Sequence, residues 1–178
     1  MEYDYIIIGS GFGGSVSALR LSKKGYSVLV VEKGKWYKAN DFPKTNWNFR
    51  KWLWLPKVRF FGIMKLTIFR HIAVVSGTGV GGGSLVYANT LPVPKSAFFE
   101  TGSWAKLNNW ENELSPYYDE ALRMLGAAKN PKFFDGDLGL KKVAKILKME
   151  DQFHATNVAV YFGEENVTKA DPYFDGEG

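Results

Sequence analysis

The fold of this 178-residue chain is decided near its start by Tyr5-Ile6-Ile7-Ile8 followed by Gly9-Ser10-Gly11-Phe12-Gly13-Gly14. The apolar run predicts a buried strand, and the glycine-rich turn opens an amphipathic stretch that predicts a helix. A second apolar run, Val28-Leu29-Val30-Val31, predicts another strand, and Glu32 follows it. An acidic residue about 20 positions beyond a G-x-G-x-x-G turn is typical of dinucleotide-binding units. We therefore expect an α/β fold with a Rossmann-like parallel βαβ core.

Each residue type in this motif has a physical role in holding a dinucleotide. Gly9 permits the tight turn, Gly11 lets the backbone approach a pyrophosphate, and Gly14 lets the helix pack closely on the sheet. The first turn of the helix then offers unpaired N–H groups to the phosphates. Glu32 is placed to accept hydrogen bonds from ribose hydroxyls. The alternative is an ordinary βαβ unit with a glycine turn.

A second glycine-rich loop, Gly77-Thr78-Gly79-Val80-Gly81-Gly82-Gly83-Ser84, follows a predicted strand at Ile72-Ala73-Val74-Val75. One such loop is enough for a pyrophosphate, so a second loop indicates another flat part of a ligand, such as an isoalloxazine ring, lying against bare backbone. This loop favours FAD over NAD, which the first loop alone does not separate. The alternative is a structural turn, because glycine clusters generally mark turns.

These motifs carry a resemblance to a known family. The stretch from Tyr3 to Gly34, together with the stretch from His71 to Pro94, resembles the N-terminal part of the glucose–methanol–choline (GMC) oxidoreductases, above all the cholesterol-oxidase-like branch. The resemblance implies an FAD-dependent enzyme that oxidises CH–OH groups by hydride transfer to flavin N5. It also implies that the FAD-binding fold is incomplete here relative to the full family fold.

The resemblance also implies the cofactor-binding residues. The first loop would contact the FAD pyrophosphate, Glu32 the adenosine ribose, and the residues after Ser84 the flavin. One departure is that the branch usually has Asn-Gly after Ser-Leu-Val, where this chain has Tyr87-Ala88. The expected set is Gly9, Gly11, Phe12, Gly13, Gly14, Glu32, Lys33, Gly79, Gly82, Gly83, Ser84, Tyr87, Ala88 and Asn89.

No catalytic residue is expected within this chain. Family members place a catalytic His, with an Asn or a second His, near the C-terminus, and the histidines here are His71 and His154. We place His71 in the strand before the second loop and His154 ahead of a strand-like run at 156–162, both in structural roles. We therefore expect this chain to be the N-terminal portion of a longer flavoenzyme and to be inactive alone. Binding of its alcohol or sterol-like substrate would also require a C-terminal half.

Two other functions remain open from the sequence. One is an NAD- or FAD-dependent oxidoreductase of another family, and the other is a non-catalytic nucleotide-binding or membrane-surface module. The first predicted region spans residues 1–100 and holds the FAD-binding core. The second spans 101–178 and holds a helical connection and the start of the substrate-side region.

Residues 33–70, here called the basic–aromatic segment, have the most unusual composition. They contain ten Lys or Arg residues, ten aromatic residues and a single carboxylate, Asp41. The favoured interpretation is an insertion that covers the cofactor, with aromatic side chains packed inward and charges in water. Peripheral membrane contact through 36–69 is the second interpretation. Nucleic-acid binding is the least favoured, and we expect no nucleic-acid partner.

The C-terminal region is predicted to have a structural role. Ser115-Pro116 predicts a helix start with Pro at the first helical position and an end at Gly126, and a second helix is expected at about 137–148. Asp135-Gly136-Asp137 is interpreted as a turn and helix cap rather than a calcium loop, and no metal site is expected.

Composition sets the remaining expectations. The chain has no cysteine and a formal net charge of +5. It has no apolar run near the ~18 residues of a spanning helix, and its first strand leaves no room for a leader. These features predict a cytoplasmic protein. Exposed apolar surface on an incomplete fold would also favour self-association.

Overall fold

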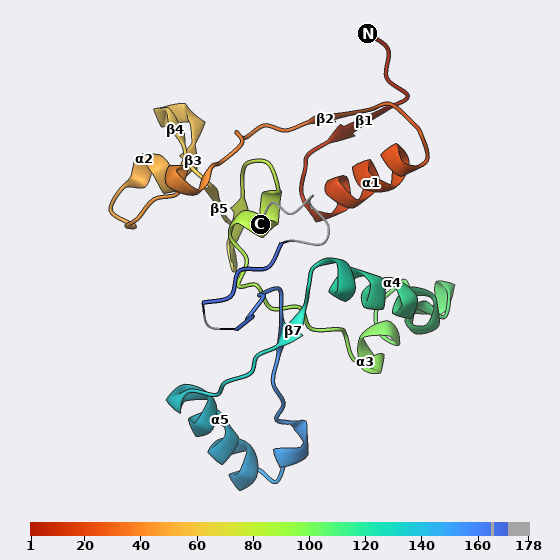
Figure 1. The fold of residues 1–178 in the computed structure, drawn as a ribbon, viewed down its shortest axis with the longest axis vertical. Helices are drawn as coiled ribbons and strands as arrows, with labels where there is room; N and C mark the ends of the chain where they lie inside the picture. Colours follow the sequence, from red (N-terminus) through yellow and green to blue (C-terminus); the bar gives the residue numbers. More distant parts are fainter. Residues whose placement is uncertain (165, 171–178) are drawn as a thin grey trace. The chain divides into compact units, whose positions relative to one another are not determined.

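The computed structural model describes residues 1–164 and 166–170 and divides into two compact units, residues 1–88 and residues 89 onward (Figure 1). Residues 171–178, the end of the second predicted region, lie outside the described residues. Within the described residues, the strands form four two-stranded sheets. The assignment of an FAD-binding core to residues 1–100, and of a helical connection and the start of the substrate-side region to residues 101–178, stays a prediction.

The first unit opens with the predicted βαβ core. Strand β1 (Tyr5–Ile8) pairs in parallel with β2 (Val28–Val31), and helix α1 (Phe12–Lys23) connects them and contacts both (Figure 1). Gly25 ends the helix: its φ is +90°, and its N–H donates to the Ser22 carbonyl at 2.9 Å. This left-handed conformation costs glycine little. The predicted α/β fold with a parallel βαβ core is confirmed.

Gly14 allows the close packing of α1 on the strands. A Cβ atom at this position would collide with the carbonyl oxygen of Gly9 and lie 3.3 Å from the Ile7 side chain. The predicted packing role of Gly14 therefore has a direct steric basis.

The basic–aromatic segment folds into short elements. Helix α2 (Phe49–Trp52) is followed by a small antiparallel hairpin of β3 (Trp54–Leu55) and β4 (Phe60–Phe61). Single turns of 3-10 helix, η1 (Ala39–Asp41) and η2 (Pro56–Val58), complete it. Aromatic side chains pair within the segment, as Trp54 does with Phe61 at 5.6 Å between ring centroids. Trp36 and Trp47, however, remain 72% and 82% exposed. The expectation that the aromatic side chains pack inward is therefore wrong for Trp36 and Trp47, because these short elements leave them uncovered.

A longer hairpin leads into the second glycine loop. Strand β5 (Met64–Ile68) pairs antiparallel with β6 (Ala73–Gly77), and η3 (Gly82–Leu85) follows the loop. The observed strand β6 thus begins and ends later than the strand predicted at 72–75. His71 lies in the turn between the strands rather than in a strand, because Phe69 N–H closes this turn on the Ile72 carbonyl at 2.8 Å.

The second unit is mainly helical. Its elements are α3 (Ser96–Phe99), η4 (Ala105–Leu107), α4 (Trp110–Met124), β7 (Ala128–Lys129), α5 (Asp135–Ile146), η5 (Glu150–Gln152) and β8 (Asn157–Val158). Phe99 is the buried centre of an aromatic cluster with Phe98, Trp104 and Tyr118. The predicted strand-like run at 156–162 contains only β8, which pairs with the two residues of β7. Because β7 has only two residues, it offers no further backbone partners to the residues that follow Val158.

The predicted helix start at Ser115-Pro116 is wrong. Helix α4 begins at Trp110, where the Asn109 side chain accepts a hydrogen bond from Asn112 N–H at 3.3 Å, and Pro116 lies inside the helix. An Asn cap and acidic residues in the first turn outweigh the one hydrogen bond that an internal proline removes. Helix α5 begins at Asp135, and Asp137 accepts a hydrogen bond from Phe134 N–H at 2.9 Å. The predicted cap is confirmed.

No helix in the described part of the chain is both long and apolar enough to cross a membrane.

Replacing Gly14 with Ala tests the steric basis of the core. The added methyl group must push α1 away from β1, so we expect the free energy of unfolding to fall by about 1–3 kcal/mol. Urea titration measures this. Gly13→Ala is the matched control, because a Cβ at Gly13 meets nothing within 4 Å and alanine favours helix. Equal effects of the two substitutions would show that Gly14 is not held against Gly9.

Candidate functional site

A buried serine joins three segments of the first unit. Ser10, only 6% exposed, donates two hydrogen bonds to Glu32 Oε2, from its N–H at 2.9 Å and its Oγ at 2.8 Å. Its Oγ also accepts a hydrogen bond from Gly81 N–H at 3.1 Å. One hydroxyl can donate once and accept at the same time. Ser10 therefore ties the first glycine loop to the end of β2 and to the second glycine loop.

Glu32 is held as a charged group. Burial raises the pKa of Glu32, but hydrogen bonds from Ser10 and from the Gly34 N–H outweigh burial, so the pKa lies below its ordinary value of 4.5. The carboxylate is thus ionised at neutral pH. Its Oε1 accepts a hydrogen bond from Gly34 N–H at 3.0 Å, and a carboxylate oxygen can accept more than one hydrogen bond. Glu32 is only partly buried, so Oε1 can accept a further donor.

The start of α1 has the properties of an anion site. No side chain caps this end, and its first turn contains no acidic residue. The first-turn N–H groups have no acceptor within the helix, and the helix dipole places positive charge there. A Cβ added at Gly11 meets nothing within 4 Å, so the backbone borders open space. These features fit a pyrophosphate.

The second glycine loop packs directly on the first. A Cβ at Gly82 would lie 2.8 Å from Gly11 Cα, and one at Gly83 would lie 3.0 Å from the Phe12 ring. Gly79 is buried against Gly34, where a Cβ on Gly34 would collide with its backbone. Contacts with backbone and side-chain atoms of the protein thus account for these glycines even before a ligand is considered. A flavin contact by Gly79, Gly82 or Gly83 stays a prediction.

Other predicted residues fall into two groups. Tyr87 packs edge-on against Phe12, with ring centroids 5.6 Å apart, and Ser84 Oγ donates to the Gly81 carbonyl at 3.0 Å, so both belong to the paired loops. Lys33 is exposed beside Glu32, and Ala88 is the last residue of the first unit. Asn89 belongs to the second unit, where its Nδ2 donates to the Ala159 carbonyl at 3.0 Å. A flavin contact by Asn89 also stays a prediction.

Sequence reasoning missed three residues of this site. Ser10 and Gly81 form the link between the loops, and the only available signal was the serine between two motif glycines. Thr78 is 1% exposed, and its hydroxyl has no hydrogen-bond partner among the described residues. An unpaired buried hydroxyl is costly, which makes Thr78 a feature of the loop that a bound group could satisfy.

Neither histidine belongs to the glycine loops. His71 lies in the turn between β5 and β6, and His154 Nδ1 lies 2.9 Å from the Gln152 carbonyl in the second unit. Two hollows on the described surface lie elsewhere, one along α5 and one around Trp47 and Arg50.

Ser10→Ala tests the link between the loops. It removes a donor to Glu32 and leaves the Gly81 N–H unpaired, so we expect a loss of about 1–3 kcal/mol in the free energy of unfolding at neutral pH. It should also raise the pKa of Glu32 toward 4.5, measurable by NMR titration. Ser15→Ala is the control, because Ser15 Oγ donates only to the Ser10 carbonyl among the bonds identified.

The pH dependence follows from the sign of this shift. A carboxylate with a lowered folded-state pKa stabilises the protein above its unfolded pKa, and the stability is lost as pH falls through the folded pKa. Wild-type stability should therefore drop as the pH falls below about 4.5, and the drop should be smaller in Ser10→Ala. Identical acid profiles for the two proteins would contradict the assigned role of Glu32.

Comparison with known proteins agrees with this geometry. Residues 7–35 match the family described as an NAD(P)-binding Rossmann-like domain. A cholesterol oxidase from Acinetobacter baumannii is 50% identical over 181 residues, covering 99% of this chain and 33% of that protein. A cholesterol oxidase from Mycobacterium tuberculosis (strain ATCC 25618 / H37Rv) is 46% identical over 182 residues, covering 99% and 32%.

A more distant relative, a long-chain-alcohol oxidase from Arabidopsis thaliana, is 29% identical over 123 residues, covering 68% of this chain and 16% of the relative. The chain spans about a third of the length of the two cholesterol oxidases that it matches. The match over nearly the whole chain includes the strand, both glycine loops and Glu32. These matches support the predicted resemblance: the chain is similar to the N-terminal region of the glucose–methanol–choline oxidoreductases, in particular of their cholesterol-oxidase-like members.

Proposed function

We propose that this chain is the FAD-binding portion of an oxidoreductase that acts on CH–OH groups. The observation that carries the proposal is the pairing of two glycine loops through Ser10, with the open start of α1 and the ionised Glu32 beside it. A pyrophosphate, a ribose and a flat ring system need these three features, which are an anion site, a carboxylate and a glycine-lined surface. The relatives named cholesterol oxidase and long-chain-alcohol oxidase support the reaction class.

The proposed roles of the residues follow from their positions. The N–H groups at the start of α1 bind the pyrophosphate, and Gly11 keeps the backbone free of a side chain there. Glu32 accepts hydrogen bonds from the adenosine ribose through Oε1, and its charge disfavours a ribose 2′-phosphate. The second loop orients the ligand with backbone alone, beside Tyr87. The bound flavin supplies an acceptor for hydride from a hydroxyl-bearing carbon.

The substrate class proposed for the complete protein is an alcohol or sterol-like molecule, by analogy with the names of its relatives. A general base must take the hydroxyl proton in such a reaction. We propose that this base lies outside the chain, since His154 Nδ1 lies against the Gln152 carbonyl and His71 lies in an exposed hairpin turn. The chain alone should then bind the cofactor without turning over alcohols.

Cofactor choice can be tested by titrating the purified chain with FAD, FMN and NAD and following flavin fluorescence or heat. We expect FAD to bind most tightly, because Glu32 interacts with a ribose that FMN lacks. Glu32→Gln should weaken FAD binding by about 1–3 kcal/mol and should weaken FMN binding less, because FMN lacks the adenosine ribose. FMN binding as tight as FAD binding, or preference for NAD, would contradict the proposal and favour another class of nucleotide-binding protein.

Gly11→Val tests the location of the pyrophosphate. The valine side chain would enter the open space beside the first loop, so we expect FAD binding to be lost while the circular dichroism spectrum is retained. Gly139→Val is the matched control, because Gly139 lies in α5 of the second unit and a Cβ there also meets nothing within 4 Å. Full FAD occupancy in a folded Gly11→Val protein would place the ligand elsewhere.

A further inference from the structure

Two neighbouring amides of the second glycine loop are held, directly or through Ser10, by the residues that follow β2. Val80 N–H donates to the Lys35 carbonyl at 3.1 Å. Gly81 N–H donates to Ser10 Oγ at 3.1 Å, and this hydroxyl donates in turn to Glu32 Oε2 at 2.8 Å. The second loop is therefore attached at the position proposed to receive the adenosine ribose.

Both oxygens of the Glu32 carboxylate lead to this loop. Oε2 reaches Gly81 through Ser10. Oε1 accepts the Gly34 N–H at 3.0 Å, and Gly34 packs so closely on the loop that a Cβ there would collide with the Gly79 backbone nitrogen. A carboxylate is rigid and planar, so a ligand that fixes Oε1 also fixes Oε2. A ribose on Glu32 would therefore immobilise the groups that hold the loop.

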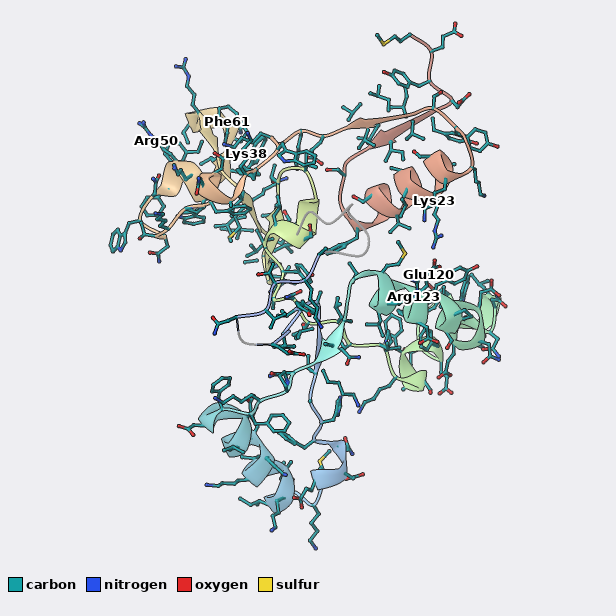
Figure 2. The ribbon with its side chains drawn as sticks, in the orientation of Figure 1. Lys23, Lys38, Arg50, Phe61, Glu120 and Arg123 are labelled. Carbon is teal, nitrogen blue, oxygen red and sulfur yellow. The ribbon has the colours of Figure 1, made fainter. Side chains whose placement is uncertain are left out.

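Tyr37 extends this attachment beyond the carboxylate. A Cβ added at Gly79 would collide with the Tyr37 ring, so the ring lies directly against the loop backbone. The Tyr37 hydroxyl donates to the Phe61 carbonyl at 3.2 Å, and Phe61 lies on β4 of the basic–aromatic segment (Figure 2). Contacts with the loop thus continue from Glu32 into the segment that follows it.

The second loop has the means to change its arrangement. Gly79 and Gly81 have φ of +145° and +102°, and glycine moves through this part of conformational space at little cost. Thr78, which precedes them, has a buried hydroxyl with no hydrogen-bond partner among the described residues. An unpaired buried hydroxyl costs free energy, so an arrangement of the loop that pairs it competes with the described one.

We propose that Glu32 couples the two ends of the cofactor site. A ligand bound to Oε1 orders the second glycine loop through Ser10 and Gly34, and the ordered loop binds the ring system more tightly. Such coupling needs no large movement, because a ligand that orders a segment spares the next ligand that cost. This inference rests on the proposed function, since it places the adenosine ribose on Glu32. It goes further by making the adenosine half a ligand that controls the flavin half.

The test divides the cofactor into two probes, ADP and riboflavin, and titrates the purified chain with each probe alone and in the presence of the other. We expect saturating ADP to tighten riboflavin binding, followed by flavin fluorescence, by about 5–150-fold, the usual range of coupling between sites. Because coupling of binding is reciprocal, saturating riboflavin should tighten ADP binding by the same factor, measured by calorimetry.

Hydrogen exchange followed by NMR locates the coupling in the wild-type chain. ADP alone should slow exchange of the Val80 and Gly81 amides, with the amides of α2 as the internal reference. Ser10→Ala removes the acceptor of Gly81 N–H and should reduce the ADP enhancement of riboflavin binding several-fold. Ser15→Ala is the matched control and should retain it, because Ser15 Oγ donates to the Ser10 carbonyl rather than to its hydroxyl. The wild-type measurements decide the question even if Ser10→Ala does not fold.

The outcomes separate this inference from the proposed function. ADP binding that changes neither riboflavin affinity nor exchange at Gly81 would overturn the coupling and leave the proposed function standing. Equal enhancement in the wild type and in Ser10→Ala would overturn the role of Ser10. Uniform slowing that includes α2, without enhancement, would indicate general stabilisation by a bound ligand and would also overturn the coupling. Absence of ADP binding, or ADP binding unchanged in Glu32→Gln, would contradict both the coupling and the proposed function.

Discussion

The hydrogen bonds of Ser10 join the first glycine loop, the end of β2 and the second glycine loop at the proposed cofactor site. Its N–H and hydroxyl bind the same Glu32 oxygen, and its hydroxyl accepts from Gly81, 71 residues further along the chain. Charge-assisted hydrogen bonds of this kind are stronger than neutral ones, and Ser10 is buried from competing water. The position of the second loop on the first therefore depends on an ionised Glu32.

Glycines serve two purposes in these loops, and the structure separates them. Gly14, Gly82 and Gly83 are glycines because protein atoms occupy the space of their side chains. Gly11 is different, since its missing side chain leaves open space. A motif read from sequence cannot make this distinction, because both kinds of glycine satisfy the same pattern. Packing thus accounts for Gly14, Gly82 and Gly83 but not for Gly11 or Gly13, and a ligand contact at Gly11 stays a prediction.

The parallel βαβ core was predictable because its signals are local: an apolar run, a turn and an amphipathic helix lie within thirty residues. The Ser10–Gly81 bond was not, because no local pattern reports a contact across 71 residues. The start of α4 was predicted at Pro116 because proline is common at the first helical position. The competing cap at Asn109 carries a weaker sequence signal, although its side chain fixes the observed start.

The first unit exposes two kinds of apolar surface, and their chemistry differs. On the β1–β2 sheet, Ile6, Ile8 and Val31 are exposed, with Ile8 at 89%. Parallel sheets are normally covered on both faces, so this two-stranded sheet carries apolar surface that the described residues leave uncovered. The basic–aromatic segment instead interleaves its apolar side chains with cations, and buried cations without partners are costly in a protein interior. Charge placement therefore distinguishes the two surfaces, because the exposed face of β1–β2 is apolar whereas the basic–aromatic segment mixes exposed apolar side chains with exposed cations.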